Sequence, residues 1–265
     1  MLAAARSEFV RAGRPLLLGG WLGLTALFAL MIDTVMFTAV SRGVALPPGA
    51  PGVSFPSAAE LAGQSGIAAG LAAASSIFGI VTLSFWALLT ASDYSSGLVR
   101  ILVAVQPRRW KLLAGKVAVL VALTAAAVTV ATIVSVTVAV PAARSAGIST
   151  DAWWRDPLVA VGSAWLDLFA AQIVWGVVGL ALAIVARSSA VAIGVGVGYL
   201  LLIESIVKMG FSGNTDWLPG STLAALAHGG TASLAFATAL GLGIAYAGIG
   251  LAVAAGVFIR RDVTD

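Results

Sequence analysis

This chain of 265 residues contains no cysteine and one histidine, and only 10% of its residues are charged. The absence of cysteine excludes disulfides, thiolate metal ligands and a cysteine nucleophile. A single histidine, His228, argues against a histidine-based metal site within one chain. Charge is also too sparse for a soluble domain, in which about 25% of residues are usually charged. These shortages leave little room for enzyme chemistry and argue against a soluble fold.

Long apolar runs take the place of charge, since 60% of the residues are hydrophobic and the mean hydropathy is +1.04. Runs of this length are typical of helices that cross a membrane. We expect a single all-α integral membrane domain over residues 1–265 with six transmembrane helices. The expected spans are 15–40, 66–92, 112–141, 158–186, 190–209 and 232–259.

The basic residues indicate how these spans are oriented. With both termini in the cytosol, eleven of the fifteen Lys and Arg residues face inward and four face outward, as the positive-inside rule favours. The net charge of +4 then suits anionic lipid headgroups and not nucleic acid. Residues 1–14 mix apolar and basic side chains, which predicts an N-terminal interfacial helix, with a frayed basic tail as the alternative.

A short helix is expected outside the membrane before the last span. Residues 217–230 contain a helix start at Pro219, a short apolar run and a terminal Gly229-Gly230 pair. The segment is too short to cross a membrane. We expect His228, at its end, to lie on the outer surface.

The segment between the second and third spans is the most distinctive part of the sequence. Leu98, Ile101, Leu102 and Val105 recur at helical spacing and predict a short helix with one apolar face, which Pro107 should end. Basic residues surround it, namely Arg100, Arg108, Arg109, Lys111 and Lys116. Such a helix could dock into a groove on a cytosolic partner; alternatively, the segment is an ordinary inner loop that is basic for topological reasons.

Its spacing resembles the inner segment of type-2 ABC exporter permeases. An acidic residue, a glycine, an arginine, a short apolar helix, a proline, an arginine and a lysine follow in order: Asp93, Gly97, Arg100, Pro107, Arg109 and Lys116. The resemblance implies that this segment is the coupling helix, which contacts the ATP-hydrolysing subunit. It assigns that contact to Asp93, Gly97, Leu98, Arg100, Ile101, Leu102, Val105, Pro107 and Arg109.

The same resemblance implies the partners. Gly115-Lys116 lacks the glycine spacing of a phosphate-binding loop, so we expect no ATPase site and no bound cofactor or metal on this chain. ATP and magnesium would be held by a separate ABC ATPase subunit, present in two copies. A second permease chain, identical or different, would complete the pathway, with a homodimer as the expected form. The complex would export an amphipathic or hydrophobic compound across a bacterial plasma membrane.

Four charged residues lie in or beside the spans: Asp33, Asp167, Glu204 and Lys208. Helix length places Asp33 about 27 Å from Pro15, and Asp167 about 30 Å from Arg187, so both should be solvated or paired near the outer boundary. Glu204 and Lys208 are four residues apart, which predicts an ion pair. All four are candidates for an outer gate or a cargo contact, with simple neutralisation as the alternative.

Other functions remain open at this point. A proton- or sodium-coupled transporter would use Asp33, Asp167 or Glu204 as the carrier, but would need a carboxylate near the middle of the membrane. An intramembrane enzyme has little support, because no metal or nucleophile spacing is present. Import and lipid handling are further alternatives to export.

Overall fold

The computed structural model describes residues 15–43, 55–105, 108–211 and 213–260. These ranges form helices and no strand, and six helices are long and apolar enough to cross a membrane. Their bounds are Pro15–Ser41 (α2), Ser75–Ser95 (α5), Arg109–Ser145 (α7), Pro157–Ala186 (α8), Ser189–Gly210 (α9 to α10) and Phe236–Arg260 (α12). The prediction of an all-α membrane protein with six spans is confirmed. The predicted interfacial helix at 1–14 lies outside the described residues.

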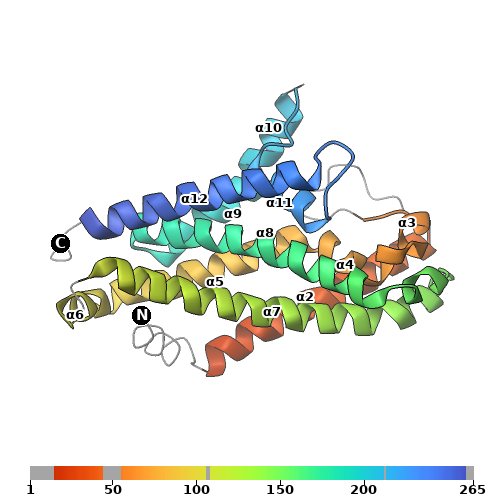
Figure 1. Cartoon of the computed structure of the whole chain (residues 1–265), viewed down its shortest axis with the longest axis horizontal. Coiled ribbons are helices and arrows are strands. Elements are labelled where there is room, and N and C mark those ends of the chain that lie inside the picture. Colours follow the sequence, from red (N-terminus) through yellow and green to blue (C-terminus); the bar gives the residue numbers. More distant parts are fainter. Residues whose placement is uncertain (1–14, 44–54, 106–107, 212, 261–265) are drawn as a thin grey trace.

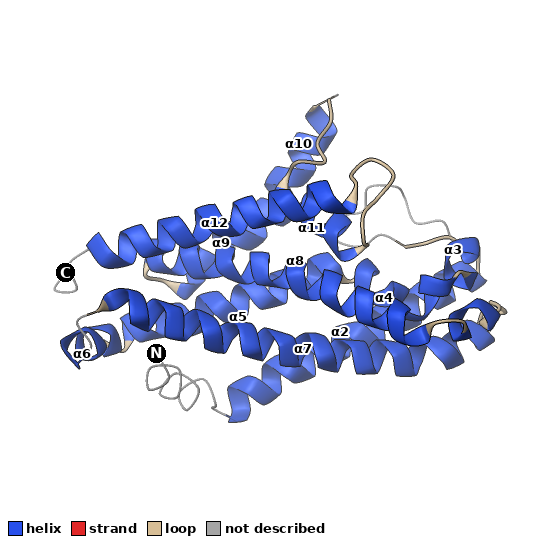
Figure 2. Cartoon of the chain, viewed as in Figure 1, coloured by secondary structure: helices blue, strands red, loops and turns tan. Residues whose placement is uncertain are grey.

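Short helices cover the two ends of the bundle (Figure 1). They are α3 (Ala58–Ala62), η1 (Gln64–Ala68), α4 (Ala69–Ala73), α6 (Leu98–Val105), η2 (Asp151–Trp154) and α11 (Pro219–Ala227). We call the end that carries α6 the α6 end; it also contains the C-terminus of α12. The opposite end, with α3, η1, α4, η2 and α11, is the α3 end. Figure 2 shows that helices make up nearly all of the described chain.

Helix α8 forms the centre of the bundle, because 67% of its most apolar stretch is buried, against 22% for α2 and 11% for α12. It packs against α5, α7, α9, α11 and α12. Gly176 of α8 leaves space that the ring of Trp86 occupies, and Gly79 of α5 does the same for Trp175. Trp86 also donates a 2.9 Å hydrogen bond to Thr124 of α7. Aromatic rings seated over glycines therefore hold α5 and α8 close together.

The second span differs from its prediction at 66–92. Residues 64–73 form the separate helices η1 and α4, and α5 begins only at Ser75. The chain bends at Ala68 (φ −121°, ψ 12°), where helical geometry is interrupted. Gly66 then lies against the Leu61 carbonyl and Trp153, and Gly70 lies against Asp33. Hydropathy could not reveal this break, since residues 66–73 consist only of Gly, Ala, Ile and Leu.

The boundaries of the other five spans differ from the predictions by at most four residues, and the fifth span differs mainly in its interior. Helix α7 runs for 37 residues and continues past Pro141, which ends the predicted span. Helix α12 begins at Phe236 and not at 232. Within the fifth span, Tyr199–Ile203 form a π-helix, after which α10 projects away from the bundle (Figure 1). Such π turns often mark functional positions, and this one comes directly before Glu204.

Candidate functional site

The predicted short helix is present as α6, and a glycine sets the turn that leads into it. Helix α5 ends at Ser95, and Gly97 adopts φ +70°, a left-handed conformation that favours glycine. Its N–H donates to the carbonyl of Tyr94 at 3.1 Å, and its own carbonyl accepts from Arg100 at 3.2 Å. Space does not require the glycine, since a Cβ here would meet no atom within 4 Å. Backbone conformation therefore selects Gly97 at the elbow between α5 and α6.

Helix α6 turns two different faces inward and outward. Val99 is buried, and Leu98 and Leu102 are half-buried against the bundle. Ile101, by contrast, is 61% exposed, and Arg100 beside it is also exposed. The predicted apolar face is thus divided: Leu98 and Leu102 lie against the bundle with Val99, whereas Ile101 is exposed to solvent. Val105 has only its backbone described, and Pro107 lies outside the described residues.

An ion pair fixes the two helices that flank α6. Asp93 at the end of α5 and Lys116 in α7 are 2.7 Å apart, and each side chain is 13% exposed. Lys116 also donates to the Leu89 carbonyl at 3.3 Å. The sequence contained both residues within the family-like spacing but did not predict their contact. The contact could have been predicted from the sequence, because Asp93 and Lys116 carry opposite charges on the two helices that flank a short connection.

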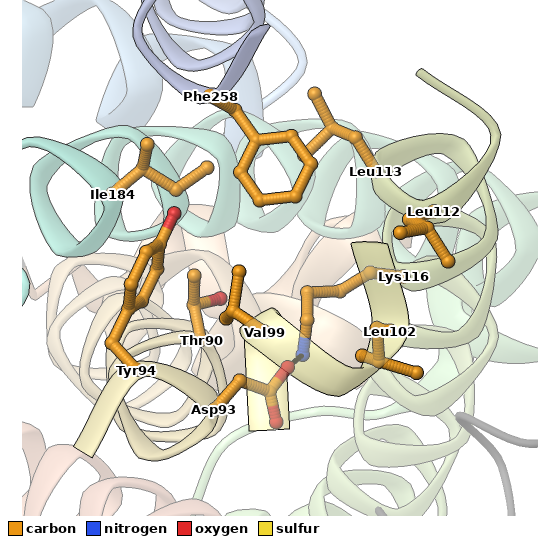
Figure 3. A pocket seen from close by; sticks show the side chains of 10 residues that line it. All are labelled: Thr90, Asp93, Tyr94, Val99, Leu102, Leu112, Leu113, Lys116, Ile184 and Phe258. Carbon is orange, nitrogen blue, oxygen red and sulfur yellow. Dashed lines mark ion pairs between the residues drawn. The ribbon is translucent and has the colours of Figure 1, made fainter. Parts of the chain in front are cut away.

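The ion pair forms one wall of a cavity beneath α6 (Figure 3). Its other walls are mostly apolar and come from α5, α6, α7, α8 and α12. The lining residues are Thr90, Asp93, Tyr94, Val99, Leu102, Leu112, Leu113, Lys116, Ile184 and Phe258. Helix α6 therefore lines a cavity together with four of the six spans, α5, α7, α8 and α12.

Arg109 connects the start of α7 to the end of α12. Its guanidinium donates to the carbonyls of Phe258 and Ile259, each at 3.2 Å. Carbonyls in the last turn of a helix have no partner within the helix, and an arginine there satisfies them and complements the helix dipole. Arg109, predicted as a contact to the ATPase, thus also has a structural role within the chain.

Arg187 is a residue of the α6 end that the sequence marked only for topology. It ends α8 with φ 52°, the only described non-glycine residue with positive φ. Its guanidinium lies 6.0 Å from the ring centre of Tyr94, a cation–π distance. Arg187 therefore ties the end of α8 to the end of α5.

At the α3 end, Glu204 and Lys208 form the predicted ion pair, with 2.9 Å between their charged atoms. Glu204 does more than neutralise Lys208. Its carboxylate accepts hydrogen bonds from the backbone N–H groups of Gly220 and Ser221, both at 2.8 Å, and from the Ser221 hydroxyl at 3.0 Å. Those groups belong to the first turn of α11, whose own N-cap, Leu218, offers no side-chain acceptor. A carboxylate at a helix N-terminus stabilises it through the exposed N–H groups and the helix dipole.

Glu204 is therefore an anchor for α11. The side chain is 2% exposed, whereas Lys208 is 45% exposed. Gly220 permits the approach, because a Cβ there would collide with the carboxylate. The predicted short helix before the last span is present as α11, and His228 at its end is exposed. Its position on the outer side of the membrane stays a prediction. The contact of Glu204 with α11 could have been expected from the sequence, because Leu218 before α11 cannot cap the helix, and its first N–H groups therefore need an acceptor from elsewhere in the chain.

The two aspartates of the spans have different surroundings. Asp167 is half-buried and lies beside Gly229, just after α11. Asp33 is 1% exposed, and neither of its carboxylate oxygens has a hydrogen-bond partner. The expectation that Asp33 is solvated or paired is therefore wrong, because α4 packs against α2 there and Gly70 lies against the carboxyl group.

Neither end provides a metal site, since the described residues contain no group of three or more His, Asp or Glu side chains arranged to hold a metal ion. No protein-family model and no curated protein matches this chain. The resemblance to ABC exporter permeases therefore depends on the spacing of residues 93–116 in the sequence and stays a prediction.

Proposed function

We propose that this chain is the membrane-spanning permease subunit of an ABC exporter, which moves an amphipathic or hydrophobic compound outward with energy from a separate ATPase. The observation that carries the proposal is α6, a short helix that is anchored to the bundle on one side and exposes Ile101 and Arg100 on the other. An exposed apolar side chain beside a positive charge suits a groove on a protein partner.

The contacts of α6 provide a route for coupling. A force on α6 reaches α5 through the Gly97 elbow, and α7 through the Asp93–Lys116 ion pair. Arg109 passes it from α7 to α12. Closure of the ATPase subunits would therefore tilt several spans together.

The partners follow from the charge distribution and the motif. The basic α6 end faces the cytosol of a bacterial cell, with both termini on that side and anionic lipids around it. Two ATPase subunits bind ATP and magnesium, and a second permease chain, identical to this one, completes the pathway. The mostly apolar spans suit a cargo with few polar groups.

The test is capture of the ATPase from native membranes by the tagged, full-length chain in mild detergent, with identification by mass spectrometry. A variant carrying Arg100→Glu and Ile101→Asp should fold and lose the ATPase. The matched control is Trp154→Asp with Arg155→Glu, a similarly exposed apolar and basic pair at the α3 end. Equal recovery of an ATPase by all three proteins would contradict the role of α6.

An ion-coupled transporter is the second candidate, and buried Asp33 is the observation that favours it. Transport that follows a proton or sodium gradient, with no ATPase recovered from folded wild-type protein, would support this candidate over the first.

A further inference from the structure

Among the described residues, Asp33 is the only one whose carboxylate oxygens are buried without a hydrogen-bond partner. It lies in α2 where that helix meets α4, and both oxygens are buried without a hydrogen-bond partner. Unpaired carboxyl groups are rare within membrane-spanning helices, because an uncompensated charge there is costly. A buried carboxyl group at this position does not stabilise α2, so we expect a functional reason for it.

The surroundings of Asp33 are small, apolar and tightly packed. Gly70 of α4 lies directly against the carboxyl group, and a side chain on Gly70 would collide with it. Ser135 of α7 is a polar neighbour of the carboxyl group, although no hydrogen bond of normal geometry joins its hydroxyl to either carboxylate oxygen.

Charged groups on the neighbouring elements lie far from Asp33. Helix α4 has no titratable residue. Helix α5 has Asp93 and Tyr94 in its last turn, at the α6 end. On α7, Arg144 is nine residues beyond Ser135, about 14 Å along the helix, and Lys116 is about 28 Å away in the other direction. Arg109 and Lys111 are farther still. None of these groups forms an ion pair with Asp33.

The packing restricts what this carboxyl group could bind. A metal cation would need several oxygen ligands around it, and the described residues contain no group of three or more His, Asp or Glu side chains arranged to hold one. A cargo molecule would need space, which Gly70 and Asp33 fill together. A proton needs neither ligands nor space.

We propose that Asp33 is a proton-binding site, whose carboxyl group carries a proton while α4 is packed against α2. When α4 moves away and water enters, the O–H bond breaks, the proton passes to water and the carboxylate becomes hydrated. Binding of a proton from water reverses the step. Since α4 leads through Ala74 directly into α5, occupancy of the site is linked to the position of a spanning helix. This inference does not depend on the proposed ATPase partner.

The test is infrared spectroscopy of the purified full-length chain, labelled with ¹³C in its aspartate carboxyl groups, in lipid nanodiscs near neutral pH. The wild-type protein should show the C=O band of a protonated carboxylic acid. Asp33→Asn should lose this band, and Asp167→Asn, the matched control in another span, should keep it. The Asn variant should also fold, because an amide has nearly the shape of the neutral acid.

Three results would overturn the proposal: no acid band in the folded wild type, persistence of the band in Asp33→Asn, or its loss in Asp167→Asn. If Asp33→Asn does not fold, the spectra of the wild-type protein and of Asp167→Asn still test the proposal. A band present in both supports the site, and a band missing from the wild type refutes it.

Discussion

The two ends of this bundle hold their polar side chains in different ways. At the α6 end, the Asp93–Lys116 ion pair is partly exposed and lies beside a cavity. At the α3 end, Trp153 and Glu204 are buried and satisfy backbone groups of neighbouring elements. The first arrangement leaves space beneath α6, whereas the second holds the short helices in place.

This difference indicates that the α6 end should move more easily than the α3 end. The Asp93–Lys116 pair joins α5 to α7 and is partly exposed, so breaking it should cost less than breaking the buried contacts of the α3 end. Buried hydrogen bonds are costly to break, because the separated groups are left without partners. The variants below test this contrast, from the largest expected effect to the smallest.

Replacing Trp153 should destabilise the α3 end most. Its side chain is fully buried, and its ring N–H donates to the Leu61 carbonyl at 2.8 Å. We expect Trp153→Ala to lower the free energy of unfolding by about 3–5 kcal/mol. Trp153→Phe should lose about 1 kcal/mol, mainly through the hydrogen bond. Denaturation in detergent measures both, with exposed Trp154→Ala as the control. If Trp153→Ala lowered the free energy of unfolding no more than Trp154→Ala, the buried Trp153 would not stabilise the attachment of η2.

Replacing Glu204 should release the start of α11. Glu204→Gln should cost about 2 kcal/mol, because the buried acceptor loses its charge. Lys208→Gln should cost less than about 1 kcal/mol, since Lys208 is partly exposed. Hydrogen exchange at the amides of Gly220 and Ser221 provides the readout, and only the Glu204 variant should accelerate it strongly.

Transport by the same variant separates two roles. Full export by Glu204→Gln, together with faster exchange in α11, would establish Glu204 as an anchor and remove it from any outer gate or cargo contact. Equal exchange in the Glu204 and Lys208 variants would instead show that the ion pair holds α11.

Breaking the ion pair at the α6 end should have a smaller effect. Lys116→Met should cost about 1–2 kcal/mol, between the values for exposed and buried pairs. Adding Asp93→Asn should recover part of this loss, because the carboxylate is then no longer unpaired. A double-mutant cycle measures the coupling, which should be about 1 kcal/mol. Strict additivity would show that the contact contributes nothing.

The two faces of α6 should respond differently to the same change. Ile101→Asp should alter the free energy of unfolding by less than about 0.5 kcal/mol, because the side chain is exposed. Leu102→Asp should destabilise the protein clearly, because it would place a charge in the cavity wall. Thermal unfolding of the two variants compares them directly, and equal losses would contradict the assignment of the faces.

The smallest effect concerns the cap of α3. The Ser57 backbone N–H and hydroxyl donate to the Glu60 carboxylate and lower its pKa. Because the folded pKa lies below the unfolded value, the cap stabilises α3 fully above the unfolded pKa and loses this effect as the pH falls through the folded pKa. Carboxyl ¹³C NMR of labelled glutamates should show Glu60 titrating below a free glutamate. A Ser57→Ala variant should return it toward the ordinary value.

The sequence predicted most of the long helices because their cause is local. Apolar length alone requires a membrane span, and Gly97 and Pro219 mark turns through their own backbone preferences. The prediction was wrong at 66–74, where the chain folds back as η1 and α4 although its hydropathy is that of a span. Gly66 and Gly70 take part in that fold, but their contacts with Trp153 and Asp33 join segments far apart in the sequence.

The features of the candidate sites likewise fall into two groups, those set by local sequence and those set by packing between distant segments. By itself the sequence determined the membrane-spanning character, the count of six long helices, the short helix at 98–105 and the Glu204–Lys208 pair, since each depends on composition or on spacing within one helix. Only the tertiary structure decided that Asp93 pairs with Lys116, that Glu204 caps α11 and that Asp33 is buried without a partner. Each of these depends on which helix faces meet, and packing between distant segments sets that arrangement.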